Sequence, residues 1–213
     1  QYDPDVIWLH NLHGYYIHIG LLFRYLRTCG KRIIWTLHDC WAFTGHCAYF
    51  DFAGCGKWKT GCPCCPQKQA YPASRGLDGS RSNYARKKAL FTDIPDLHLT
   101  VPSYWLEKRV KQSFLRDYPV EVVYNTVNRE VFKPTPGDFR KKHGLDGKII
   151  LLGVASVWDA RKGLADFLGL ADMLDDRYRI VLIGLREDQI STLPENILGL
   201  PRTNNLTELV QAY

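Results

Sequence analysis

The sequence lacks several features that would assign it to a class at once. No apolar run approaches the ~18 residues of a membrane-spanning helix, and no secretory signal opens the chain. Neither a Gly-x-Gly-x-x-Gly turn nor a Walker phosphate loop occurs. A Ser-His-Asp hydrolase is a weak alternative, because the Gly-x-Ser-x-Gly elbow is also absent. We therefore expect a cytoplasmic protein.

Positive charge is concentrated in the first part of the chain. The net charge of the 213 residues is +6. Residues 1–136 carry 18 Lys and Arg against 11 Asp and Glu, whereas residues 137–213 carry 10 against 11. The stretch 57–88 holds eight basic residues and one acid, Asp78. This stretch predicts a solvated basic face, or a surface that binds a phosphate-bearing substrate or an anionic membrane. Membrane binding would place the protein in peripheral contact with the inner face of the membrane.

Short apolar segments alternate with segments of helical periodicity along the whole chain. We expect strands at 5–10, 32–37, 97–101, 120–124, 148–155, 179–184 and 196–199. We expect helices at 17–28, 81–92, 103–115, 162–174 and from 205 onward, with Ser103 as the N-cap of the third. This alternation predicts an α/β protein with parallel sheets.

A segment with little apolar periodicity separates two such series. Pro134, Pro136 and Gly137 lie in it, and residues 125–136 suit a linker. We place a first Rossmann-like domain at 1–136, including a Cys-rich loop at 38–80, and the beginning of a second at 137–213. Both ends are abrupt and the second domain has only about 75 residues, so we expect both domains to be incomplete.

Polar side chains follow two neighbouring strands of the first domain. His10, Asn11 and His13 come directly after one strand, and His38 and Asp39 after the next. The carboxyl ends of parallel strands are where α/β proteins bind ligands. The sequence therefore predicts a polar ligand-binding rim, although these groups could also merely satisfy one another.

The aperiodic loop 38–80 is too long for an ordinary connection. Cys47, Cys55, Cys62 and Cys65 give the spacing Cys-x7-Cys-x6-Cys-x2-Cys. Four such thiols suit a tetrahedral structural zinc ion, which would explain how the loop is ordered. Free thiols and disulfides are the alternatives, and a cytosolic location disfavours the second.

A strand-to-helix turn in the second domain carries two cations, Arg161 and Lys162. Backbone N–H groups at a helix start favour anions, and the two side chains add charge for a pyrophosphate. The alternative is a pair of solvated cations, which a helix start disfavours unless an anion is bound.

Four segments in the same order resemble a known family. They are Asp5-Val-Ile-Trp-Leu-His10-Asn, Trp35-Thr-Leu-His-Asp-Cys-Trp-Ala-Phe-Thr-Gly-His-Cys47, Val101-Pro-Ser-Tyr-Trp-Leu106 and Gly153-Val-Ala-Ser-Val-Trp-Asp-Ala-Arg-Lys-Gly163. Together they resemble family-four glycosyltransferases of the GT-B fold, in particular the branch for capsular or colanic-acid-type polysaccharide assembly.

The resemblance implies retaining transfer from a nucleoside-diphosphate sugar to a hydroxyl of a glycan or lipid-linked acceptor, with no metal at the reaction centre. The donor would bind mostly to the second domain and the acceptor to the first. By resemblance and position, we assign catalysis to His10, His38 and Asp39, the acceptor side to Asn11, His13 and Gly14, and donor binding to Arg161, Lys162 and Arg202. The four cysteines also match positions that the family keeps.

The sequence departs from the family pattern at two places. Asn125 matches the family's linker Asn, but Thr126 stands where the family has Gly. The usual Arg upstream of Lys162 is absent, and we expect Arg161 to substitute for it. The family's Glu-x7-Glu donor motif is expected after Tyr213.

Two rival functions fit parts of the sequence. One is a non-catalytic relative that binds a sugar nucleotide or a glycan, which the missing upstream Arg would suit. The other is a zinc-stabilised nucleic-acid-binding module. We do not expect nucleic acid as a partner, because the aromatic and basic residues are not arranged as a stacking platform.

Overall fold

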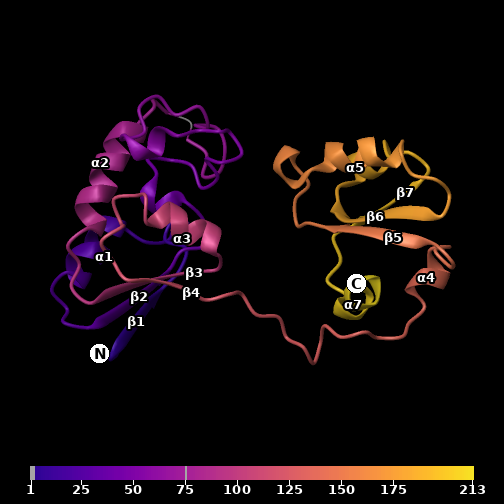
Figure 1. Ribbon diagram of the computed structural model, residues 1–213, viewed down its shortest axis with the longest axis horizontal. Coiled ribbons are helices and arrows are strands. Elements are labelled where there is room, and N and C mark those ends of the chain that lie inside the picture. The colour runs from indigo at the N-terminus through magenta and orange to yellow at the C-terminus, as the bar shows by residue number, and fades with distance from the viewer. Residues whose placement is uncertain (1–2, 75) are drawn as a thin grey trace. The chain divides into compact units, whose positions relative to one another are not determined.

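The computed structural model describes residues 3–74 and 76–213, and the chain divides into two compact units, Gln1–Thr126 and Val127–Tyr213 (Figure 1). This boundary falls near the start of the expected linker 125–136, not at its end. The residues that follow it pack with the second unit, where the ring centroids of Phe132 and Tyr213 lie 6.0 Å apart. Arg75, one of the basic residues of the stretch 57–88, lies outside the described residues.

Unit 1 is a parallel sheet in the order β1-β2-β3-β4. Its strands are β1 Val6–Leu9, β2 Arg32–Thr36, β3 Leu97–Val101 and β4 Val120–Val122. Its helices are α1 Ile19–Leu26, α2 Ser80–Phe91 and α3 Tyr104–Val110. The expected order of strands and helices in this unit is confirmed.

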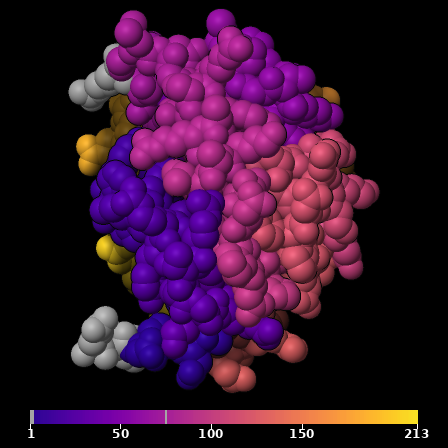
Figure 2. Space-filling view, turned by 90° about the vertical axis from the view of Figure 1, so that its left-hand side faces the viewer, coloured from indigo at the N-terminus to yellow at the C-terminus, as the bar shows by residue number. Residues whose placement is uncertain are grey.

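An aromatic cluster joins the helices of unit 1 to the sheet. Phe23 of α1, Trp35 of β2 and Phe91 of α2 are buried, with ring centroids 4.3 to 5.3 Å apart. Each such ring removes a large apolar area from water, which makes the cluster a main source of stability. The helices α1 and α2 contact each other and lie on the same face of the unit (Figures 1 and 2).

Helix α3 is shorter than expected. The hydroxyl of Ser103 accepts a hydrogen bond from the N–H of Leu106, which confirms the N-cap. The helix ends at Val110 and does not reach 115. The hydroxyl of Ser113 donates to the carbonyl of Val110 and accepts from the N–H of Leu115, and this local bonding competes with the helical pattern.

Among the described residues of the Cys-rich segment, 38–74 and 76–79, the regular structure is limited to two 3-10 turns, Trp41–Phe43 and Lys57–Lys59, so the segment is ordered mainly by packing. Trp58 and Phe50 are buried against each other, with ring centroids 4.8 Å apart. The hydroxyl of Ser80 at the start of α2 donates to the carbonyl of Cys62 at 2.7 Å. The segment is therefore built around its own aromatic core and the start of α2.

Unit 2 contains a smaller parallel sheet in the order β5-β6-β7. Its strands are β5 Ile149–Val154, β6 Tyr178–Leu185 and β7 Ile197–Pro201. Its helices are α4 Phe139–Lys142, α5 Leu164–Ala171, α6 Glu187–Ile190 and α7 Leu206–Ala212, and a 3-10 turn spans Ala160–Lys162. The sequence did not predict α4 and α6, because four residues are too few to show a helical period.

Strand β6 is the centre of unit 2 and is buried on both faces. Ile180 and Leu182 belong to the core that includes residues of α5, whereas Val181 and Ile183 belong to the core with residues of α4 and α7. Figure 1 shows these helices on opposite sides of the sheet. Two-sided burial explains why the strand reads as a continuous apolar run and not as an alternating pattern.

Gly184 in β6 provides a test of this architecture. Its φ is +97°, and a Cβ there would lie 1.8 Å from the carbonyl oxygen of Ala155. Gly184→Ala should therefore lower the stability of unit 2 by about 3 kcal/mol or more, since both the backbone and the neighbouring loop would have to shift. Chemical denaturation followed by circular dichroism measures the change.

The matched control is Gly169→Ala in α5, because that glycine is exposed and a Cβ there would meet no atom within 4 Å. It should raise stability by about 0.5–1 kcal/mol, since alanine is the better helix former. Equal effects from the two substitutions would contradict the close approach at Gly184.

Candidate active site

Parallel pairing of β1 and β2 brings two exposed histidines together at the edge of unit 1. His10 follows β1 and His38 follows β2, and the Nδ1 of His10 lies 3.0 Å from the Nε2 of His38. Their rings stack with centroids 5.3 Å apart. One of these nitrogens donates its proton to the other. The second nitrogen of each ring is not part of this hydrogen bond. Two residues of the predicted polar rim therefore lie side by side in the structure.

His13 and Asp39 lie beneath this edge and are largely buried. The Nε2 of His13 is 3.4 Å from a carboxylate oxygen of Asp39, whose other oxygen accepts the N–H of Trp41 at 2.8 Å. Burial lowers the pKa of His13, the nearby Asp39 carboxylate opposes this shift, and Lys87 adds to it. The ring of His13 also packs against Trp41 and Tyr71. His13 therefore suits a positioning role for Asp39 better than the direct acceptor contact expected from the sequence.

Asn11 and Gly14 are exposed on the loop between β1 and α1. The backbone carbonyl of Asn11 accepts a hydrogen bond from the Tyr16 hydroxyl at 2.9 Å. A Cβ at Gly14 would lie 2.9 Å from the ring of Tyr16, so this glycine allows the tyrosine to fold back over the loop. Both residues lie where an acceptor could reach them.

The carboxyl edge of the unit 2 sheet carries the predicted donor-binding cations. Arg161 and Lys162 lie exposed in the turn between β5 and α5, and Arg202 directly follows β7. The carboxylate of Asp159 accepts the N–H of Lys162 at 3.0 Å, so one backbone donor of this turn is already used. The side chains of Lys162, Arg161 and Arg202 are exposed at this edge.

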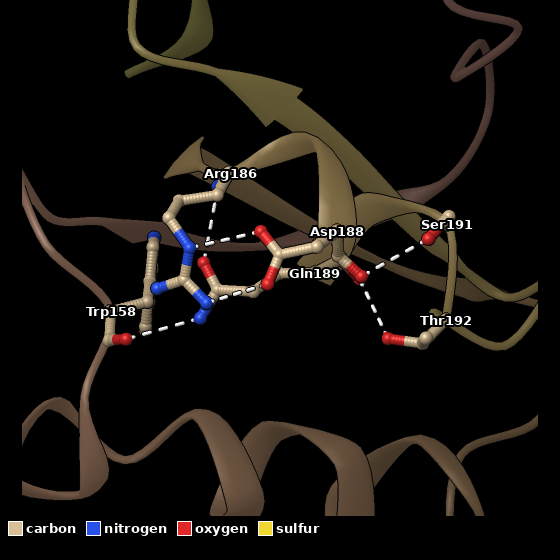
Figure 3. A network of polar contacts seen from close by, with 6 residues as sticks. All are labelled: Trp158, Arg186, Asp188, Gln189, Ser191 and Thr192. Carbon is tan, nitrogen blue, oxygen red and sulfur yellow. Dashed lines mark hydrogen bonds and ion pairs between the residues drawn. The ribbon is translucent and has the colours of Figure 1, made fainter.

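Sequence reasoning missed Arg186, which follows β6 at the same edge. It forms an ion pair with Asp188, with the Nη2 and Oδ2 atoms 2.7 Å apart (Figure 3). The next residue, Gln189, accepts the N–H of Arg186 and donates to the carbonyl of Trp158, so α6 is tied to the loop after β5. A basic residue directly after an apolar strand was the signal for this position.

Sequence reasoning also missed Lys87, which it placed on the basic face 57–88. Lys87 is only 4% exposed. Its ammonium donates to the carbonyls of Trp41 at 2.7 Å and Thr44 at 3.0 Å, and lies 3.6 Å from the centroid of the Trp41 ring. Burial lowers its pKa to about 7. The prediction of a solvated face is therefore wrong for this residue, and the run of cations around it gave no sign of its burial.

The four predicted zinc ligands line one small cavity beside His46 and Trp58, whereas Cys64 is exposed and does not line it. Burial raises the pKa of Cys47 to about 12, and it raises the pKa values of Cys62 and Cys65. The N–H of Gly45 donates to the sulfur of Cys62 at 3.1 Å. Across residues 3–74 and 76–213, no group of three or more His, Cys, Asp or Glu has the arrangement of a formed metal site. The thiols still fit zinc as a donor set, since metal binding deprotonates such ligands.

The sequence was compared with protein families and with curated proteins. No protein-family model matches the sequence. The putative colanic acid biosynthesis glycosyl transferase WcaC of Escherichia coli is 35% identical over 96 residues, which are 43% of this chain and 23% of that protein.

Two solved structures share the fold over nearly the whole chain. Sucrose-phosphate synthase from Thermosynechococcus elongatus aligns with a TM-score of 0.60 and 14% identity, covering 98% of this chain and 47% of that one. Anabaena HepE, solved in complex with UDP-glucose, aligns with a TM-score of 0.56 and 13% identity, covering 96% and 50%. The chain spans about half the length of these structures. Its GT-B fold and its resemblance to GT-B glycosyltransferases are confirmed.

We propose that Cys47, Cys55, Cys62 and Cys65 hold one zinc ion, and elemental analysis of the purified protein should find about one equivalent per chain. Cys65→Ser should remove most of it, because a tetrahedral site would lose one of its four thiolates. Cys64→Ser is the control and should retain the metal, since that thiol lies outside the cavity. A metal-free protein whose loop amides resist hydrogen exchange would contradict zinc ligation.

Lys87 should make stability depend on pH. Its pKa is about 7 in the folded protein and 10.5 in the free side chain, so at intermediate pH the unfolded chain binds the extra proton. Stability should then rise with pH by about 1.4 kcal/mol per unit over this range. Asp39, Cys47, Cys62 and His13 are the titratable groups nearby.

The buried thiols shift stability in the opposite sense, since their raised pKa values make the folded chain bind the extra proton. The comparison of wild type with Lys87→Met at pH 7.5 and 9.5 therefore isolates the lysine. Between these two pH values, the free energy of unfolding of the wild type should rise by about 2 kcal/mol more than that of Lys87→Met. Urea unfolding measures both changes. Parallel pH profiles would show that Lys87 stays protonated in the folded state.

Proposed function

We propose that the protein is a retaining glycosyltransferase, which moves a sugar from a nucleoside-diphosphate sugar to a glycan or lipid-linked acceptor in surface polysaccharide synthesis. The observation that carries the proposal is that each unit presents polar groups at the carboxyl edge of its parallel sheet. Unit 1 presents His10 and His38, and unit 2 presents Arg161, Lys162 and Arg202. Carboxyl edges of this kind are the usual ligand sites of α/β folds.

The cations of unit 2 suit the charge that develops in this reaction. Cleavage of a glycosyl–phosphate bond leaves negative charge on the departing diphosphate, and preorganised cations stabilise it. Arg161 offers a planar fork for phosphate oxygens and Lys162 a mobile point charge. The proposal assigns these two, with Arg202, to the donor diphosphate. HepE was solved with UDP-glucose bound, which supports a sugar nucleotide as the class of donor.

The histidines of unit 1 suit the sugar end of the donor. His10 and His38 are exposed, and their ring nitrogens can donate to or accept from the hydroxyl groups of a sugar. We assign His10 to the transferred sugar and His38 to holding the ring of His10. Asp39 is too enclosed for a direct contact and acts through the loop that it holds at Trp41.

Location at the membrane is a further part of the proposal. In residues 3–74 and 76–213, no helix is long and apolar enough to cross a membrane. We propose a cytoplasmic protein whose exposed basic residues Lys57, Lys59, Arg81 and Lys88 contact the anionic inner face of the membrane. Sedimentation with vesicles tests this, and equal binding to neutral and anionic vesicles would contradict it.

Turnover separates the proposed enzyme from a non-catalytic relative. A panel of labelled nucleoside-diphosphate sugars is incubated with a membrane extract as the acceptor source, and transfer of label to lipid or polymer is measured. The enzyme should transfer one sugar, and His10→Ala should abolish most of the transfer. Tight donor binding without any transfer would support the binding relative.

Lys162→Ala should lower turnover by the equivalent of roughly 2–4 kcal/mol in activation free energy, the range for loss of one preorganised charge stabiliser. Folding should be little affected, because the side chain is exposed. Steady-state kinetics with the preferred donor measures the loss.

Arg177→Ala is the matched control, because Arg177 lies at the opposite, amino end of β6 and pairs with Asp175. Its turnover should remain near that of the wild type. If Lys162→Ala also turned over normally, the diphosphate would have to be held elsewhere, and Arg202 would be the next candidate.

A further inference from the structure

A second cavity in unit 1 is lined by basic and neutral polar groups. Its volume is about 410 Å³, and it lies among the loop after β1, the Cys-rich segment and α2. It is lined by Tyr15, Ile19, Trp41, Gly45, His46, Pro72, Ala73, Ser74, Asn83, Arg86 and Lys87. No acidic residue is among these, so the cavity favours an anion.

Lys87 forms the innermost cationic group of this cavity. In the described part of the chain its ammonium makes no ion pair, and its partners are two carbonyl oxygens and the face of Trp41. These partners satisfy the N–H groups, and the charge is opposed only at longer range, chiefly by the Asp39 carboxylate and the Cys62 thiol. A buried charge of this kind is costly, and an anion in the adjacent cavity would offset the cost.

Further donors surround Lys87. Arg86 is exposed, and its Nη2 lies near Gly20 at the start of α1, 3.4 Å from where a Cβ would stand. Asn83 lies three residues earlier on α2, on the same side of the helix as Arg86. The Nε2 of His46 is buried and has no hydrogen-bond partner among the described residues.

We propose that this cavity binds the phosphate or diphosphate group of a phosphorylated acceptor. Two neighbouring cations with amide and imidazole groups beside them match a multiply charged tetrahedral oxyanion, whereas a neutral glycan offers no charge for them to meet. The inference rests on the proposed function and specifies the class of acceptor. The aromatic walls formed by Tyr15 and Trp41 give the rest of such a molecule an apolar surface.

The position of Trp41 connects this cavity to the catalytic edge. Trp41 lines the cavity and also the small space beside His10 and His38. An acceptor anchored by its phosphate would therefore extend toward the histidine pair, where the acceptor hydroxyl has to lie. The phosphate anchors the acceptor and takes no part in bond formation.

Titration calorimetry with inorganic pyrophosphate tests the site, with backbone amide shifts at 45–46 and 83–87 reporting the location. Arg86→Gln should weaken pyrophosphate binding by about ten-fold or more, as expected for loss of a charge-assisted fork. Lys88→Gln is the matched control, because Lys88 is the exposed neighbour on α2 that does not line the cavity. It should leave the affinity within about two-fold.

A second arm with UDP separates the two sources of diphosphate, the acceptor and the donor. UDP binding should be weakened by Lys162→Gln and be unchanged by Arg86→Gln. The acceptor assignment is overturned if Arg86→Gln weakens UDP binding, or if Arg86→Gln and Lys88→Gln weaken pyrophosphate binding equally. If pyrophosphate fails to bind while donor transfer persists, the cavity proposal fails and the glycosyltransferase proposal stands.

Discussion

Parallel strand pairing is the constraint on which both units depend. Each strand must leave the sheet at its carboxyl end and return by a crossover, so the residues after β1 and β2 meet at one edge, and those after β5, β6 and β7 at another. The His10–His38 contact is a direct result, because the two residues are 28 positions apart in sequence but follow two strands that are neighbours in the sheet. The site chemistry is thus set by where strands end.

The cations of the two units are held under different physical conditions. Lys162 and Arg202 are exposed, where water lowers the cost of their charge and they stay free to move toward a ligand. Lys87 is buried and immobilised by two carbonyls and an aromatic face. These conditions agree with the proposed roles, in which the exposed groups follow a departing diphosphate and the fixed group anchors a phosphate.

Local sequence signals predicted much of the fold. Strand β3 has the bounds that its apolar run indicated, and Ser103 and Asn205 cap α3 and α7 through their side chains as such residues do. The early end of α3 came from bonds of the Ser113 hydroxyl, which a count of apolar positions does not register.

The site was predictable only where its residues follow strands. Lys87 stands in a run of cations on a helix with no apolar stripe, and its ammonium is held by two carbonyls of the folded Cys-rich segment. The cavity that it lines is formed by three segments distant in sequence, so no local pattern indicates it. The metal-ligand spacing, by contrast, is local, and it singled out the thiols that line one cavity.

The residues of β6 and the residues that follow it have different structural roles, which affects where substitutions are tolerated. Its side chains hold the two layers of unit 2 together, while only the residues after Leu185 face the ligand edge. Substitutions at the exposed positions Arg186, Glu187 and Asp188 can therefore accumulate with little loss of core packing, whereas Ile190 packs against the core. The residues that face this edge can thus change one at a time while the strand that holds unit 2 together stays the same.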